Sequence, residues 1–399
     1  MDFAKKRSTI DAVLLAMESI RESLDKRTKP SCTMIDLTKA FDTVNHRRLI
    51  RKCEMSGLRG KISNILATFL EDRTQYVSLN DMKSALKPLS CGVPQGSVLG
   101  PLLFLIYIND LPQVVEKSQV TMFADDCYFL ENNSTSNEMA DMNSVSKWLE
   151  ENKLTLNKTK TVRVQFNRVQ YNSDGDPIYA KYLGIHIDPS LSFQIHIDKI
   201  IKRTARTTFV IYQLRFVFRR EYLFLIYKVY LQPIFQYGVL IYGTADKTKL
   251  LKLEARQKQI IRNCFCLRKF NSLQEIKEKY KICYIRELHI YELLKLLTQI
   301  IRRTHSSQVI NDIITEEELR EVLDDNHTRK KLRSLEKMTK NNIKKIKNRV
   351  RILFNSIIKF DSNIIRNLLT CETKNLNSLL HNYRDIYICN NKDLISLFW

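Results

Sequence analysis

Two adjacent aspartates, Asp125 and Asp126, lie within an otherwise largely apolar stretch of the sequence, Val120–Leu130. The flanking residues predict two short strands that meet in a turn at this pair. Two partly buried carboxylates side by side repel each other, and a divalent cation relieves the repulsion. Because Mg²⁺ prefers carboxylate oxygens together with substrate phosphates, the pair indicates a metal site. A surface turn that contains two aspartates is the alternative.

A third aspartate, Asp36, lies near the end of the apolar run Cys32–Leu37, which follows Pro30 and predicts a strand. A carboxylate that projects from a strand end can hold a metal ion against a sheet. An aspartate after a strand is also a common helix cap or turn residue. By itself Asp36 therefore fits either role.

The segment Gly92–Pro101 is rich in glycine and leads into a predicted buried helix. Glycine lets a ligand approach the backbone closely, and a helix start can bind an anion. An ordinary structured loop before a buried helix would show the same pattern.

The first half of the chain alternates predicted helices and strands. Helices are expected over Ser8–Asp25 (capped by Ser8 or Thr9), Arg47–Glu54, Lys61–Glu71, Leu99–Asp110 and Asn137–Glu151. Besides those already named, strands are expected over Gln75–Leu79, paired with Leu86–Cys91, and over Thr161–Phe166 and Tyr182–Ile187.

Beyond about Phe193 the spacing of apolar residues is helical throughout. Long helices are expected over Ile195–Arg215, Tyr222–Gln236, Lys247–Cys264, Arg286–Arg303 and Lys330–Ile358. An α+β part followed by an all-helical part predicts two units with a boundary near Asp188–Ser192.

The formal net charge is +22, from 65 Lys plus Arg against 43 Asp plus Glu. Such an excess indicates a polyanionic partner, and nucleic acid is the leading one, although a generally basic surface is the alternative. Basic residues concentrate in Thr328–Arg351, with eleven Lys or Arg and one acid, Glu336. We expect this tail to contact phosphates, a solvated charged helix being the alternative.

The start of the chain, Met1–Thr9, lacks the apolar core of a secretory signal, and no apolar stretch is long enough to span a bilayer. The nine cysteines are therefore expected to be reduced thiols. Cys264 and Cys266 have no neighbouring histidine pair and are interpreted as buried apolar residues rather than zinc ligands. We expect an intracellular protein, nuclear or cytoplasmic, without a membrane partner.

Taken together and in this order, the segments resemble the reverse transcriptase domain of non-LTR (LINE-like) retrotransposons of the jockey type. The resemblance extends from Ser8 to about Asn263. It rests on Asp36-Leu-Thr-Lys-Ala-Phe-Asp42-Thr-Val-Asn-His46 (motif A), Gly92–Pro101 with Leu102–Pro112 (motif B), Phe123-Ala-Asp-Asp126 (motif C), Trp148 with Leu154–Asn157 and Lys160-Thr161 (motif D), and Tyr182-Leu-Gly184-Ile-His-Ile-Asp188 (motif E).

The resemblance implies an α+β fold, with the palm of a right-hand polymerase followed by an all-helical thumb and a helical C-terminal region. The palm, an antiparallel sheet with helices, and partial fingers would occupy residues 1–190. The thumb and connection would occupy residues 191–310, and the basic helical region residues 311–399.

The implied activity is that of an RNA-directed DNA polymerase, by two-metal nucleotidyl transfer onto a primer 3′-hydroxyl. The partners would be an RNA template, a DNA primer and dNTPs. Asp36 and Asp125 would hold two Mg²⁺ ions, or Mn²⁺, and Asp126 would complete the acidic cluster. Lys160 matches the motif D lysine proposed as general acid for pyrophosphate, with a solvated lysine as the alternative.

The nucleotide would contact Leu37, Ala40, Phe41, Gln95 and Gly96. Phe41 matches the aromatic gate that excludes a ribose 2′-hydroxyl, and simple core packing is the alternative. Asp42 is expected to be structural. A separate group, Tyr182, Leu183 and Gly184, would grip the primer.

Family members carry fingers strands upstream of a segment like Arg7-Ser8-Thr9, and an endonuclease domain before those. The chain starts almost at this segment, so it looks like a fragment with impaired nucleotide binding, or the product of a 5′-truncated element. A catalytically inactive nucleic-acid-binding protein is the alternative.

Phe41 and the Pro-Gln-Gly segment argue against an RNA-dependent RNA polymerase, and the tail shows no maturase-like domain.

Overall fold

The chain divides into two compact units, Met1–Gly184 and Ile185–Trp399, which are described separately. The computed structural model describes residues 8–132, 138–166, 171, 175, 177–268, 271–302 and 350. For residues 138–140 it describes only the backbone. The predicted tail helix Lys330–Ile358 and nearly all of residues 311–399 lie outside these ranges.

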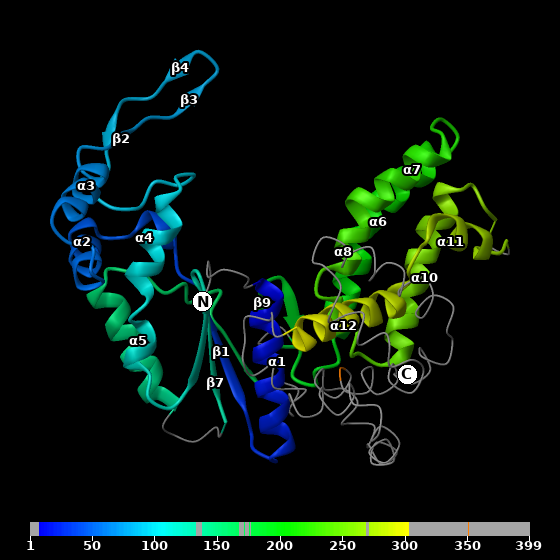
Figure 1. The fold of residues 1–399 in the computed structure, drawn as a ribbon, viewed down its shortest axis with the longest axis horizontal. Coiled ribbons are helices and arrows are strands. Elements are labelled where there is room, and N and C mark those ends of the chain that lie inside the picture. Colours follow the sequence, from blue (N-terminus) through cyan, green and yellow to red (C-terminus); the bar gives the residue numbers. More distant parts are fainter. Residues whose placement is uncertain are drawn as a thin grey trace. The chain divides into compact units, whose positions relative to one another are not determined.

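Unit 1 alternates helices and short strands, as the sequence predicts (Figure 1). Its elements are α1 (Thr9–Asp25), β1 (Ser31–Ile35), η1 (Ala40–Asp42), α2 (His46–Met55), α3 (Lys61–Leu70), β2 (Thr74–Gln75), β3 (Ser78–Leu79), β4 (Met82–Lys83), β5 (Lys87–Pro88), α4 (Leu99–Ile108), η2 (Leu111–Val114), β6 (Gln119–Phe123), β7 (Asp126–Glu131), α5 (Glu138–Glu151), β8 (Val162–Gln165) and β9 (Ala180–Tyr182).

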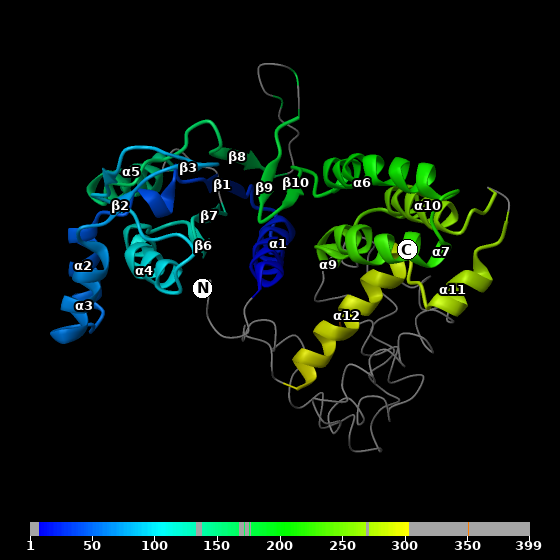
Figure 2. The ribbon, with the colours of Figure 1, turned by 90° about the horizontal axis from the view of Figure 1, so that it is seen from above.

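A four-stranded antiparallel sheet in the order β6-β7-β1-β8 forms the centre of unit 1. Figures 1 and 2 show α1 on one side of this sheet and α4 with α5 on the other. Side chains alternate between the two faces of a strand. Ile35, Cys127 and Phe129 therefore enter the core formed with α2–α5, whereas Met34 and Tyr128 lie on the opposite face.

The first helix begins where the sequence predicts because Ser8 caps it. Its Oγ accepts from the Asp11 backbone N–H at 3.2 Å, and the Asp11 carboxylate accepts from the Ser8 N–H at 2.9 Å. This reciprocal pair satisfies two N–H groups at the helix start. The apolar stripe of α1, including Val13, Met17 and Ile20, is fully buried.

The strand predictions need two corrections. Gln75–Leu79 is split, because β2 pairs with β5 while β3 pairs with β4 in an exposed hairpin. Tyr182–Ile187 is not one strand. Leu183 and Gly184 have φ angles of +44° and +82°, so β9 ends at Tyr182 and β10 (Ile185–Ile187) begins after a turn.

Beyond β10, the described part of unit 2 is helical, as expected (Figure 1). Its helices are α6 (Gln194–Leu214), α7 (Arg220–Ile226), η3 (Tyr227–Leu231), α8 (Gln232–Gln236), α9 (Val239–Tyr242), α10 (Lys247–Cys264), α11 (Gln274–Tyr280) and α12 (Ile285–Ile301). The predicted helix Tyr222–Gln236 contains a π-helical turn, η3, just before Pro233, which lacks the N–H that a continuous α-helix needs.

The seven described cysteines are free thiols. Cys264 is fully buried, as predicted, and burial raises its pKa to about 12. The same interpretation is wrong for Cys266, which is exposed in the turn after α10. Within the described ranges, no helix has the length and apolar character needed to cross a bilayer.

Gly92 is where the glycine-rich segment packs onto the loop after β1. Its N–H donates to the Val44 carbonyl at 2.8 Å, and the next N–H, of Val93, donates to the Phe41 carbonyl at 2.8 Å. Gly92 has φ +91°, and a Cβ there would lie 2.8 Å from the Asp42 carbonyl oxygen. The glycine therefore permits a close approach of protein backbone rather than of a ligand.

We predict that Gly92→Ala lowers the free energy of unfolding by about 2–4 kcal/mol, since backbone strain and a steric clash add. Gly57→Ala is the matched control, because Gly57 has φ +95° but open space around it. It should lose only about 1 kcal/mol. Urea unfolding measures both, and equal losses would show that the contact with Asp42 is unimportant.

Candidate active site

The sheet register brings two of the three predicted carboxylates together. Ile35, the last residue of β1, pairs with Cys127 of β7, so the next position places Asp36 beside Asp126. The alternation of the strands puts both side chains on the face of Met34 and Tyr128. Residues distant in sequence thus meet at one end of the sheet.

The third carboxylate, that of Asp125, lies in the turn that joins β6 to β7. Phe123 pairs with Asp126, which leaves Ala124 and Asp125 as a two-residue turn. Ala124 has φ +52°, the left-handed conformation that tight hairpins require. The predicted pair of strands meeting at the aspartates is confirmed, although no glycine marks the turn.

The closeness of these carboxylates changes the electrostatics of Asp126. Burial, and then the negative charges of Asp125 and Asp36, raise its pKa to about 6, while Lys181 and Lys160 oppose the rise. All three aspartates are partly buried. The site therefore holds negative charge that the fold itself only partly neutralises.

Two side chains contact the Asp36 carboxylate: Lys160 brings a positive charge to it, and Asn157 brings a hydrogen-bond donor. The Lys160 ammonium lies 3.3 Å from Oδ2 of Asp36, although its side chain is 67% exposed. Asn157 donates from Nδ2 to the same oxygen at 3.0 Å, and its backbone N–H donates to the Asp36 carbonyl at 2.8 Å. Asn157 belongs to the segment that resembles motif D, but nothing in the sequence predicts its hydrogen bonds with Asp36.

The donor chemistry of the three aspartates fits a divalent cation, which binds carboxylate oxygens. Within the described ranges, however, no three His, Cys, Asp or Glu side chains are arranged as a ready group of metal ligands. Lys160 occupies one oxygen of Asp36 instead. A cation held here would compete with this ammonium for Asp36.

The predicted nucleotide-binding residues divide into exposed and buried ones. Phe41 is partly buried and stacks on Phe104, with 4.4 Å between ring centroids. Gln95 is exposed and donates from Nε2 to Oδ1 of Asp42 at 2.7 Å, and Gly96 beside it is exposed with φ +81°.

Two further predicted nucleotide contacts, Leu37 and Ala40, are only 3% exposed and belong to the core. A nucleotide at this site would therefore meet mainly their backbone atoms. In the predicted primer grip, Tyr182 is buried with its ring 5.4 Å from that of Tyr128, while Leu183 and Gly184 form the turn after β9.

Comparison with known proteins identifies relatives of this chain. Residues 1–187 match the family described as reverse transcriptase (RNA-dependent DNA polymerase). The RNA-directed DNA polymerase from mobile element jockey of Drosophila melanogaster is 30% identical over 267 residues, which are 60% of this chain and 29% of the relative. The probable RNA-directed DNA polymerase from transposon BS of the same species is 28% identical, over 65% of this chain and 32% of the relative.

The chain thus spans about three tenths of the length of these curated relatives. Among solved structures, telomerase from Candida albicans with a fragment of telomeric RNA matches with a TM-score of 0.40 and 15% identity. That match covers 70% of this chain and 55% of the telomerase chain.

The raised pKa of Asp126 predicts a measurable pH dependence of stability. In the unfolded chain this carboxyl ionises near pH 4, and in the folded protein near pH 6. Between these values the folded protein binds more protons, so its free energy of unfolding falls as the pH rises. Asp126→Asn should remove this fall and be more stable than the wild type at pH 7 by about 1–2 kcal/mol, a figure reduced for partial exposure.

Urea unfolding at pH 4 to 7.5 provides the measurement, with Asp81→Asn as the control. Asp81 is an exposed aspartate in the turn between β3 and β4. Parallel stability profiles for wild type and Asp126→Asn would contradict the proposed charge repulsion.

Proposed function

We propose that residues 1–187, which match the reverse transcriptase family and resemble the jockey polymerase, are a reverse transcriptase domain, and that this protein extends a DNA primer on an RNA template. The observation that carries the proposal is the pairing of β1 with β7, which places Asp36 beside Asp126 and next to the turn with Asp125. Two divalent cations held by these carboxylates would activate the primer 3′-hydroxyl and neutralise the departing pyrophosphate. Mg²⁺ is the expected cation, and Mn²⁺ could replace it.

Lys160 has two successive tasks in this proposal. Without a bound cation its ammonium neutralises Asp36, at 3.3 Å. Divalent cations held by the carboxylates would replace this ammonium, and the exposed lysine would then be free to give a proton to the pyrophosphate leaving group. Asn157 positions Asp36 through its two hydrogen bonds.

Phe41 and Gln95 would select and orient the nucleotide. Stacking on Phe104 fixes the ring plane of Phe41, so that its edge can exclude a ribose 2′-hydroxyl. Asp42 holds the Gln95 amide, which makes Asp42 a positioning residue that links the loop after β1 to the glycine-rich segment. Gly96 leaves open space beside Gln95.

Unit 2 would serve as the thumb and the region beyond residue 310 as a basic extension on nucleic acid, with the turn at Leu183 and Gly184 gripping the primer. The net charge of +22 favours contacts of the chain with phosphates. Because its relatives are polymerases of mobile elements, we infer that the protein acts inside the cell, in the nucleus or cytoplasm.

Primer extension tests the proposal. The full chain, an RNA template with an annealed DNA primer, dNTPs and MgCl₂ should give extended DNA. Asp125→Asn should lower the rate at least about a hundredfold, since metal ions supply several kcal/mol of transition-state stabilisation. Asp81→Asn should retain the wild-type rate. Binding of primer–template without any extension would instead identify an inactive nucleic-acid-binding protein.

Sugar selectivity tests Phe41 separately. Phe41→Val should reduce the preference for dNTPs over NTPs at least about tenfold, because the bulk that meets the 2′-hydroxyl is removed. Phe69→Val is the matched control, since Phe69 is also partly buried against the same core. If both variants lose stability and neither changes selectivity, Phe41 is a packing residue only.

A further inference from the structure

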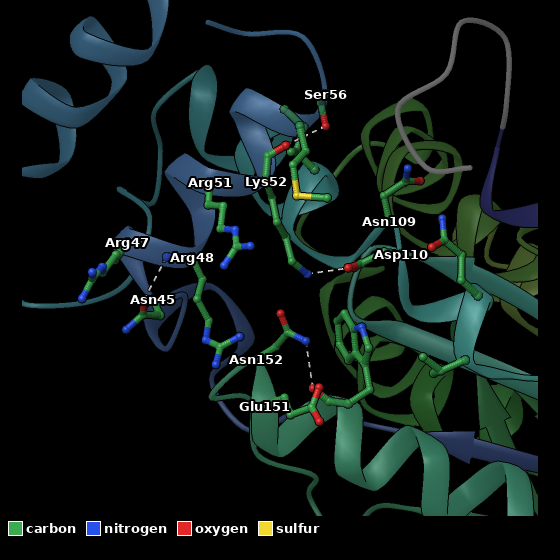
Figure 3. Close-up of a pocket in the computed structure, with 15 residues that line it drawn as sticks. Asn45, Arg47, Arg48, Arg51, Lys52, Ser56, Asn109, Asp110, Glu151 and Asn152 are labelled. Atoms are coloured by element: carbon green, nitrogen blue, oxygen red, sulfur yellow. Dashed lines mark hydrogen bonds and ion pairs between the residues drawn. The ribbon is translucent and has the colours of Figure 1, made fainter.

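A cavity of about 780 Å³ lies among α2, η2 and the ends of α4 and α5 (Figure 3). This volume is within the range of sites that bind small ligands or parts of larger ones. The cavity is lined mainly by polar side chains. They include Asn45, Arg48, Arg51, Lys52, Asp110 and Asn152.

The cavity is separate from the proposed polymerase site. None of the three aspartates Asp36, Asp125 and Asp126 lines the cavity. Both Asp36 and Asp126 belong to the face of the sheet that carries Met34 and Tyr128, as the strand register shows. The helices around the cavity pack on the other face, over Ile35 and Phe129.

Helix α2 presents an unusual concentration of positive charge to this cavity. Arg47, Arg48, Arg51 and Lys52 form two pairs of like charges four residues apart, which destabilise an isolated helix. The first turn of α2 carries no acid to match the positive end of the helix dipole. Within the described part of the chain, none of the three arginines forms an ion pair.

Lys52 is already committed to the protein. It donates to Oδ1 of Asp110 at 2.8 Å and to the Tyr107 carbonyl at 2.6 Å, and it lies 4.6 Å from the Trp148 ring centroid. The acids on the cavity wall are Asp110, which this lysine neutralises, and Glu151. In Figure 3, Arg48 and Arg51 extend from α2 toward the space in front of Asn152.

Asn152 adds a feature of a different kind. Its side chain is 4% exposed, and Nδ2 donates to the Trp148 carbonyl at 2.9 Å. Its Oδ1 accepts no hydrogen bond from any described residue. A buried acceptor without a donor is costly, so a ligand that brings an N–H or O–H group to this oxygen would be stabilised here.

We propose that this cavity binds single-stranded RNA, with backbone phosphates on Arg48 and Arg51 and a ribose 2′-hydroxyl donating to Oδ1 of Asn152. The RNA backbone supplies an anion and a hydroxyl donor at every nucleotide, whereas the DNA backbone supplies only the anion. Arg47, the exposed basic neighbour on α2, extends the positive surface along the strand. The site is independent of polymerisation and would hold RNA away from the catalytic face.

Fluorescence anisotropy with a labelled 12-nucleotide oligouridylate tests this site in the full chain. Arg48→Gln with Arg51→Gln should weaken binding at least about fivefold and lower the salt slope by about 1.4, at roughly 0.7 per phosphate on a single strand. The control, Lys61→Gln with Lys147→Gln, removes two exposed charges of unit 1 outside the cavity. It should change affinity less than twofold. Equal losses in both double variants would overturn the proposal.

Two further experiments test whether the cavity distinguishes ribose from deoxyribose and a strand from a free nucleotide. Wild type should bind the ribose oligomer more tightly than the matching deoxyribose oligomer, and Asn152→Leu should remove this preference. If Asn152→Leu does not fold, the preference for the ribose oligomer should still fall in Arg48→Gln with Arg51→Gln. Equal binding of both oligomers by the wild type would overturn the role of Asn152. Displacement of the RNA by UTP at equal nucleotide concentration would assign the cavity to a free nucleotide and also overturn the proposal.

Discussion

Repulsion among three carboxylates at the end of an antiparallel ladder is the constraint on which the site depends. The register that buries Ile35 against Cys127 also forces Asp36 beside Asp126. The hairpin turn then adds Asp125. A core made of apolar residues on one face therefore stabilises a charge cluster on the other. Burial, together with the negative charges of this cluster, raises the pKa of Asp126 to about 6. Burial of the apolar core thus offsets the repulsion that arises when folding brings Asp36 close to Asp125 and Asp126.

The segments around the cluster are arranged to tolerate this charge. Thr38 donates its N–H to the Thr155 carbonyl at 2.9 Å, which fixes the loop that carries Asn157 and Lys160 next to β1. On the other side of the loop after β1, Gly92 and Val93 pack their backbone onto Val44 and Phe41. Several sequence motifs thus meet around a single strand end, and each depends on the position of β1.

Local patterns in the sequence were sufficient for most elements. The Ser8 cap, the helix Lys247–Cys264 and the strands on either side of the paired aspartates all follow from spacing and residue type. Turns that depend on left-handed backbone conformations at residues other than glycine could not be predicted from the sequence. The turn at Leu183 and Gly184 divides a predicted strand, and the exposure of Cys266 depends on a left-handed turn with φ +56°.

The site features that could not be predicted from local patterns depend on contacts between residues distant in sequence. Sequence alone could suggest Asp36 and Asp126 as partners only through family resemblance, because the β1–β7 register is set by packing of the whole core. The ion pair of Lys160 and the burial of Leu37 and Ala40 follow from the same tertiary contacts. The arginines of α2 had no pattern that distinguished them from an ordinary solvated helix, and only the cavity and Asn152 do so.

The fold builds a carboxylate cluster, and we propose that a divalent cation relieves the repulsion within it. Urea unfolding at pH 7.5, in MgCl₂ or in NaCl of equal ionic strength, measures this for wild type and Asp36→Asn. Mg²⁺ should raise the free energy of unfolding of the wild type by about 1.4 kcal/mol at a tenfold excess over its dissociation constant, and much less in Asp36→Asn. An equal effect of Mg²⁺ on both proteins, or none on the wild type, would show that the carboxylates do not bind a divalent cation together.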